Sequence, residues 1–200
     1  MAIRIDGKAL AQKKRTKLKE KVETWLHETG QSPGLAVILV GDDSASQIYV
    51  RNKERACESV GIRSVAKRLP ASTSESDLLA LIDQLNADSE IHGILCQLPV
   101  PDHICTDHVL ERIVPEKDVD GFHPVNVGNL VLGKDCLMPC TPAGVMAMLE
   151  AYDIDPLGKR CVIVGRSTLV GKPLIQMMLA KHATVTVAHS RTKDLPAVCR

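Results

Sequence analysis

The chain has 200 residues, of which 44% are hydrophobic and only 2% aromatic, and its formal net charge is +1 at pH 7. This balance is typical of an ordinary globular chain, and it gives no electrostatic footprint for nucleic acid or an anionic membrane. No stretch approaches the roughly 20 apolar residues of a membrane span. We therefore expect neither nucleic acid nor a membrane as a partner.

Seven cysteines are spread along the chain without a disulfide or metal pattern. They form no Cys-x-x-Cys pair, and no histidines accompany them at zinc-ligand spacing. The N-terminus has no apolar segment of the signal-peptide kind. We therefore expect reduced thiols, no metal and a soluble protein of the cytoplasm.

The first half of the chain alternates predicted helices and strands. They are a helix at 8–28, a strand at 34–40, a helix at 44–60, a strand at 62–69, a helix at 74–86 and a strand at 91–98. The apolar run 34–40 between Pro33 and Gly41 predicts a strand buried on both faces. Ser44 and Gln47 have the spacing of a capping box. The alternation predicts a parallel sheet with helices on both faces.

The second half begins with residues 114–140, which are rich in Pro, Gly, Asn and Asp and predict a loop. Thr141 as N-cap and Pro142 at the first helical position then predict a helix that runs to Tyr152. A strand at 161–164, a helix and a second strand from residue 184 follow.

The segment 161–173 combines a strand, a tight glycine turn and a helix start. From Gly165 to Gly171 its spacing is Gly-x-Ser-x-x-x-Gly, one residue longer than the usual dinucleotide fingerprint, and a chance turn would look similar. The first amides of the helix can face a pyrophosphate, with Arg166 and Ser167 where a ligand would lie.

The end of the next strand indicates which nucleotide is bound. An NAD site usually has Asp or Glu there for the ribose 2′-hydroxyl, whereas this chain has His189, Ser190, Arg191 and Thr192. A cation and hydroxyls suit a 2′-phosphate, and Arg166 is a second possible partner for it. We therefore expect NADP rather than NAD as the cofactor.

The fold class expected is α/β with two domains. Residues 1–140 would form a parallel-sheet catalytic domain, and residues 141–200 the first part of a Rossmann-like NADP-binding domain. Two strands are fewer than such a domain usually has, so we expect the chain to be a fragment.

Several side chains that could do chemistry follow the first-half strands. Tyr49 and Lys53 are four residues apart and share a helix face at the carboxyl edge of the predicted sheet, where open α/β folds bind ligands. Gln97 ends a neighbouring strand, and Asp118 and Asp120 lie in a loop. Each alone is also compatible with a structural role, such as a surface lysine packed on a tyrosine ring.

Five ordered motifs make the interpretation specific. The segments 40–53, 93–99, 115–124, 139–142 and 165–173 closely resemble the bifunctional methylenetetrahydrofolate dehydrogenase/cyclohydrolase family, over nearly the whole chain. The resemblance implies NADP-dependent oxidation of 5,10-methylenetetrahydrofolate to the 5,10-methenyl cation, and hydrolysis of that cation to 10-formyltetrahydrofolate, in one cleft between the domains. It also implies a homodimer.

The resemblance further implies roles for individual residues. Lys53 would be the principal catalytic residue of the hydrolysis, Tyr49 would stack on the folate rings, Gln97 would orient Lys53, and Asp120 would bind the pterin amino edge. The implied substrate site also includes Val50, Arg51, Asn52, Cys96 and Leu98. The implied cofactor site comprises Thr141, Gly165, Arg166, Ser167, His189, Ser190, Arg191 and Thr192.

Two other functions stay open from the residues alone. The cofactor motif is shared among many folds, so an NADP-dependent dehydrogenase with another small substrate is one alternative. A nucleotide-sensing or scaffold protein without turnover is the other. The combination of Tyr49, Lys53, Gln97 and Asp120 argues against the first. An absorbance change on mixing with NADP⁺ and methylenetetrahydrofolate would exclude the second.

Overall fold

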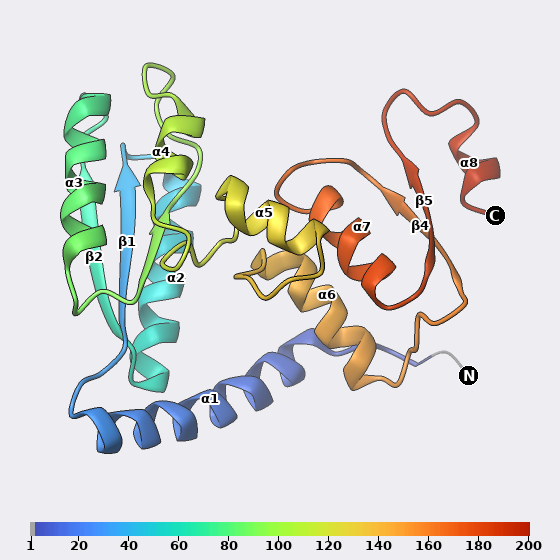
Figure 1. Cartoon of the computed structure of the whole chain (residues 1–200), viewed down its shortest axis with the longest axis horizontal. Coiled ribbons are helices and arrows are strands. Elements are labelled where there is room, and N and C mark those ends of the chain that lie inside the picture. Colours follow the sequence, from blue (N-terminus) through green and yellow to red (C-terminus); the bar gives the residue numbers. More distant parts are fainter. Residues whose placement is uncertain (1–2) are drawn as a thin grey trace. The chain divides into compact units, whose positions relative to one another are not determined.

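The computed structural model describes residues 3–200, which form two compact units (Figure 1). The β1 unit runs from Ala11 to Val119, and the β4 unit joins the N-terminal residues up to Leu10 to Asp120–Arg200. Each unit has its own parallel sheet. The domain boundary expected between residues 140 and 141 stays a prediction.

The sheet of the β1 unit has three parallel strands in the order β2-β1-β3. The central strand β1 (Gly34–Val40) has its predicted bounds, β2 is Arg63–Leu69, and β3 (Gly93–Cys96) is shorter than the predicted 91–98. The parallel sheet expected from the alternating pattern is thereby confirmed. All four residues of β3 are buried, because the strand is covered on both faces.

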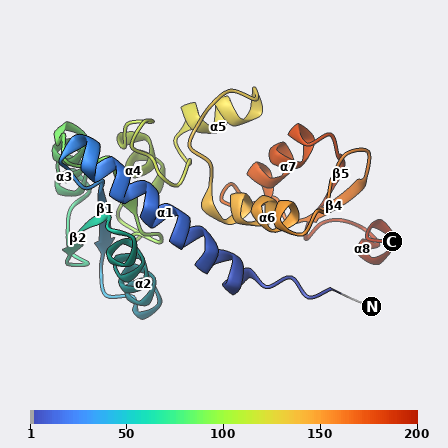
Figure 2. The same cartoon turned by 90° about the horizontal axis from the view of Figure 1, so that it is seen from below.

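Helices cover both faces of this sheet, as predicted; they are α2 (Ser44–Val60), α3 (Glu75–Ala87) and α4 (Thr106–Arg112). Helix α1 (Gly7–Thr29) instead runs across the ends of the strands (Figure 1). On one face Ile38 packs with Leu78 of α3 and Val109 of α4. On the other face Val37 packs with Val50 of α2. Figure 2 shows α2 and α3 on opposite sides of β1 and β2.

The predicted capping box at the start of α2 is wrong by one residue. Asp43 occupies the N-cap, and its carboxylate accepts a hydrogen bond from the Ser46 amide at 2.7 Å. This bond lowers the pKa of Asp43. A carboxylate is both an accepted cap and a favourable charge at a helix N-terminus, so Asp43 takes the place expected of Ser44. Gly61 ends the helix in the left-handed conformation, with φ 83°.

The β4 unit contains two parallel strands, β4 (Arg160–Val164) and β5 (Thr184–Ala188). Its helices are α5 (Pro124–Val131), α6 (Cys140–Ala151), α7 (Gly171–Ala180) and α8 (Leu195–Val198). A small core joins Ile163 of β4, Met178 of α7 and Ala183 before β5. The α/β class expected for both halves of the chain is confirmed.

Two predictions for the second half are corrected by the structure. Residues 114–140 are not all loop, because α5 begins at Pro124 after His123, whose side chain accepts a hydrogen bond from the Val125 amide. Thr141 is not the N-cap of α6; the helix begins at Cys140, after Pro139. Pro142 fits within the first turn because its missing amide hydrogen would have no partner there.

Within residues 3–200, none of the helices has the length and apolar character needed to cross a membrane.

Candidate active site

Lys53 of α2 and Gln97 after β3 lie in direct contact. The Lys53 ammonium donates a hydrogen bond of 3.0 Å to Gln97 Oε1, in a partly buried position. The Gln97 amide nitrogen donates to the Leu98 carbonyl at 2.8 Å, and its backbone amide donates to the Ile38 carbonyl at 2.8 Å. Because Gln97 is held at three points, its side-chain oxygen is fixed toward the lysine.

The other predicted substrate residues differ in exposure. Tyr49 is 62% exposed, so its ring is free to meet a ligand. Arg51 and Asn52 are also exposed on α2. Val50 and Cys96 instead pack in the core, at 0% and 4% exposure, so their side chains support the site from behind.

The segment that leads to Asp120 is anchored by Lys117. The Lys117 ammonium donates to the carbonyls of Leu85, Asn86 and Asp88 at the end of α3, at 2.7–3.1 Å. Its own carbonyl accepts a 2.7 Å hydrogen bond from the Ile94 amide. The lysine donates to carbonyl groups that have no partner within the last turn of a helix. Together the contacts fix the segment around Lys117 beside β3.

Asp118 and Asp120 follow this anchor in different surroundings. Asp118 is 2% exposed and forms an isolated parallel bridge with Ile94. Asp120 is half-buried and is the first residue of this part of the β4 unit. Gly121 follows with φ 65°, and a side chain there would collide with the Leu137 carbonyl. The backbone after Asp120 therefore requires glycine.

The turn after β4 is shaped by two glycines and one serine. Gly165 has φ 133°, which favours glycine, and a Cβ atom at Gly171 would lie 2.6 Å from the Gly165 carbonyl oxygen. The Ser167 hydroxyl accepts hydrogen bonds from the amides of Val170 at 3.2 Å and Gly171 at 3.3 Å. The close approach of α7 to this turn has the geometry of a phosphate-binding βα turn.

A second turn lies beside the first, because Val164 and Ala188 are paired in the parallel sheet. The His189 amide donates to Thr192 Oγ1 at 2.7 Å, and His189 Nδ1 accepts a 3.2 Å hydrogen bond from the Arg191 amide. Ser190 and Arg191 are exposed. The structure thus brings the predicted residues Gly165–Ser167 and 189–192 to one edge of the sheet.

Thr141 stands apart from these two turns in the chain. It is exposed in the first turn of α6, and that helix packs through Met146 and Leu149 on the core around Ile163. Its predicted place near the nicotinamide stays a prediction.

Sequence reasoning missed the anchoring role of Lys117. The residue lies within the 115–124 motif, but a lysine in a polar loop looks like a solvated surface charge. Only the position of the α3 carboxyl end reveals its three carbonyl partners. The available signal was its place directly before two aspartates.

Comparison with known proteins identifies the family. Residues 5–120 match the catalytic domain of the tetrahydrofolate dehydrogenase/cyclohydrolase family, and residues 139–200 match its NAD(P)-binding domain. The bifunctional protein FolD of Moorella thermoacetica is 61% identical over 196 residues, which are 98% of this chain and 70% of that protein. FolD of Halalkalibacterium halodurans is 58% identical over 100% of this chain and 71% of its own length.

Solved structures agree with this assignment. The crystal structure of the bifunctional FolD methylenetetrahydrofolate dehydrogenase/cyclohydrolase of Campylobacter jejuni is similar with a TM-score of 0.94 and 53% identity, over 96% of this chain and 68% of that one. The Trypanosoma brucei dehydrogenase-cyclohydrolase, complexed with NADP and an inhibitor, has a TM-score of 0.92 at 37% identity, over 98% and 67%. The chain therefore belongs to the bifunctional tetrahydrofolate dehydrogenase/cyclohydrolase family.

Proposed function

We propose that Lys53 and Gln97 carry out the hydrolytic step of this enzyme and that the turns after β4 and β5 hold its cofactor. The chain is an NADP-dependent 5,10-methylenetetrahydrofolate dehydrogenase and a 5,10-methenyltetrahydrofolate cyclohydrolase. The observation that supports the hydrolytic assignment is the 3.0 Å hydrogen bond between Lys53 Nζ and Gln97 Oε1.

The hydrolytic step adds water to the one-carbon bridge of a cationic substrate. The water oxygen bonds to the bridging carbon, the bond from that carbon to N5 breaks, and N10 keeps the formyl group. Of the two water protons, one ends on N5 and the other is released. The side-chain nitrogen of Lys53, held by Gln97, is suited to be the proton-transfer group for the attacking water.

Gln97 is suited to hold Lys53 without adding charge. Its amide oxygen accepts from the lysine, and its amide nitrogen is occupied by the Leu98 carbonyl. The exposed ring of Tyr49 is available to stack on the folate, and the carboxylate of Asp120 suits the fixed donor edge of a pterin.

The residues of the two turns fit an NADP molecule. Gly171 lets the start of α7 pack directly on the turn, since any Cβ atom there would collide with the Gly165 carbonyl, and the first amides of the helix can then face a pyrophosphate. Ser190 and Arg191 supply a hydroxyl and a cation for the 2′-phosphate. When bound, NADP⁺ supplies the acceptor for a hydride. The work of these residues is to orient it.

Substitution of Lys53 by methionine tests the assignment. Removing the amine while keeping the length of the side chain should lower cyclohydrolase activity by about 10²–10⁴-fold, the usual contribution of a proton-transfer group. Folate binding should change little. Hydrolysis of supplied methenyltetrahydrofolate is followed by its absorbance, and folate binding by calorimetry.

The matched control is Lys134→Met, which removes an exposed lysine of the β4 unit. It should retain full hydrolysis. Unchanged hydrolysis by the Lys53→Met enzyme would remove Lys53 from the mechanism, and loss of folate binding in that variant would make it a binding residue instead. Homodimer assembly and a cytoplasmic location stay predictions.

A further inference from the structure

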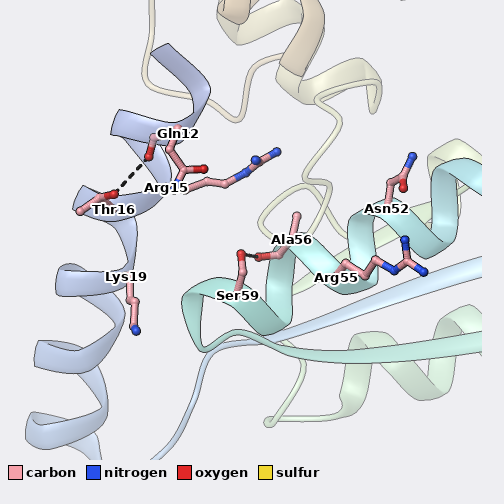
Figure 3. Close-up of a pocket in the computed structure, with 8 residues that line it drawn as sticks. All are labelled: Gln12, Arg15, Thr16, Lys19, Asn52, Arg55, Ala56 and Ser59. Carbon is pink, nitrogen blue, oxygen red and sulfur yellow. Dashed lines mark hydrogen bonds between the residues drawn. The ribbon is translucent and has the colours of Figure 1, made fainter. Parts of the chain in front are cut away.

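A groove between α1 and α2 is lined by three cationic side chains and by no acidic residue. Its volume is about 670 Å³, and its eight lining residues include Arg15, Lys19 and Arg55 but no carboxylate (Figure 3). Figure 3 shows Arg15 extending from α1 toward α2. The cations come from two helices, whereas a solvated basic helix face would place them on one.

The positive charges of this groove are poorly compensated within the chain. Among the residues that the structure describes, the side chains of Arg15 and Arg55 have no ion pair or hydrogen bond. Lys19 reaches only Glu23 of its own helix, at 3.9 Å, and both side chains are more than half exposed. Like charges brought together in this way repel one another, and an anion between them would relieve that repulsion.

Neutral donors complete the lining. The hydroxyl hydrogens of Thr16 and Ser59 are used within their own helices, where they donate to the carbonyls of Gln12 and Ala56. The side-chain amides of Gln12 and Asn52 make no hydrogen bond in the described part of the chain. The groove therefore offers guanidinium, ammonium and amide donors, which are the groups that recognise carboxylates and phosphates.

The exposure of the cations decides what kind of anion fits. A single ion pair between exposed groups contributes little binding free energy, because water screens the two charges. Only a ligand that meets several of these cations at once can add enough small contributions to bind. We propose that the groove between α1 and α2 binds an organic polyanion with two or more carboxylate or phosphate groups.

Such a polyanion could come from two sources. One is a free metabolite. The other is the glutamate end of the folate substrate, since Asn52 lines the groove and Lys53, the next residue on α2, faces Gln97. Neighbouring helix residues point about 100° apart, so the groove and the catalytic face adjoin. Only the second source depends on the proposed function.

Calorimetry on the full chain with citrate at low salt tests the site. Citrate should bind more tightly than acetate, and Arg15→Gln with Arg55→Gln should weaken citrate binding about tenfold, as expected for two exposed charge contacts. The matched control is Lys13→Gln with Lys17→Gln, which removes equal charge from exposed positions of α1 outside the groove. The emission of Trp25 checks that each variant is folded.

Three results would overturn the proposal. The first is that the parent chain does not bind citrate, and the second is that it binds citrate and acetate with equal affinity. The third is that both double variants lose the same amount of citrate affinity. The last would show that net charge alone attracts the anion.

The Michaelis constant for methylenetetrahydrofolate with one or three γ-linked glutamates distinguishes the two sources. If the substrate occupies the groove, the added glutamates lower this constant in the parent enzyme but not in the Arg15→Gln, Arg55→Gln variant. If citrate binds while the added glutamates have no effect, a free polyanion is the ligand. An enzyme inactive on the single-glutamate substrate would contradict the proposed function and leave the citrate result intact.

Discussion

The β1 unit and the β4 unit hold their candidate site residues in different ways. In β1 six of seven residues are buried, whereas β4 and β5 have one buried residue each. Gln97 continues from a fully buried strand, so a packed core fixes it. The two turns proposed to hold the cofactor are fixed instead by local hydrogen bonds to Ser167 and Thr192. Binding in the β4 unit should therefore depend on the turns themselves more than on the core.

The largest expected effect is on stability and comes from a substitution in the core of the β1 unit. Ile38→Ala removes a fully buried side chain from the central strand and should lower the free energy of unfolding by about 4 kcal/mol. Ile163→Ala, in the smaller core of β4, should cost about 2 kcal/mol because half-buried neighbours can relax around it. Urea unfolding measures both.

The single tryptophan makes the comparison sharper. Trp25 belongs to the β1 unit, so its fluorescence should follow the Ile38→Ala change and stay unaffected by Ile163→Ala. Circular dichroism reports both units. If Ile163→Ala shifted the tryptophan transition as strongly as Ile38→Ala, the two cores would unfold together and the contrast between them would be lost.

The next effect separates the two activities. Gly171→Ala places a methyl group 2.6 Å from the Gly165 carbonyl oxygen, so the cofactor turn must shift. NADP⁺ affinity should fall at least tenfold, or about 1.4 kcal/mol. Hydrolysis of supplied methenyltetrahydrofolate should remain, because Lys53 lies in the other unit.

Gly144→Ala is the matched control for that experiment. Gly144 lies inside α6, and a Cβ atom there has open space around it, so the variant should keep its NADP⁺ affinity. Calorimetric titration of NADP⁺ compares the two. Unaltered affinity in Gly171→Ala would mean that the close approach of α7 plays no part in cofactor binding.

The smallest effect concerns pH and the edge of the β1 unit. The Glu75 carboxylate accepts hydrogen bonds from the Cys105 amide at 2.6 Å and from His108 Nδ1 at 2.8 Å. The Cys105 bond first, and His108 second, lower the pKa of Glu75. The hydrogen bond to Glu75 raises the pKa of His108.

These two pKa shifts set the pH range in which the hydrogen bond between Glu75 and His108 stabilises the packing of α3 on α4. The contribution of His108 to the free energy of unfolding is fully present below the ordinary histidine pKa of about 6.5. It is lost as pH rises through the raised pKa of His108 in the folded protein. The contribution of Glu75 to the free energy of unfolding is lost only as pH falls through the lowered pKa of Glu75. His108→Gln should therefore reduce the urea midpoint slightly at pH 5.5 and leave it unchanged at pH 8.5. Equal loss at both values would indicate packing rather than charge.

Much of the β1 unit could be predicted from its sequence. The strand at 34–40 is clear because a continuous apolar run between Pro33 and Gly41 has the length of a strand and few alternatives. The resemblance of whole motifs also predicts the pairing of Lys53 with Gln97. Helix spacing alone left Lys53 compatible with a surface position.

The parts that could not be predicted depend on tertiary context. A helix at Pro124–Val131 lies in a segment rich in turn-forming residues, and the cap from His123 that begins it is an uncommon choice. Asp43 and Ser44 are both good caps, so sequence cannot choose between them. The carbonyl partners of Lys117 and the groove beside Arg55 arise only when separate elements meet.

The orientation of the Gln97 amide has a chemical consequence. Because its nitrogen donates to the Leu98 carbonyl, the amide presents its oxygen to Lys53. The lysine therefore meets a neutral acceptor rather than a charged one. A carboxylate at the same place would bind the ammonium form far more strongly and would keep the proton where it is. For the proton transfer proposed for Lys53, an uncharged neighbour is therefore a better partner than a carboxylate.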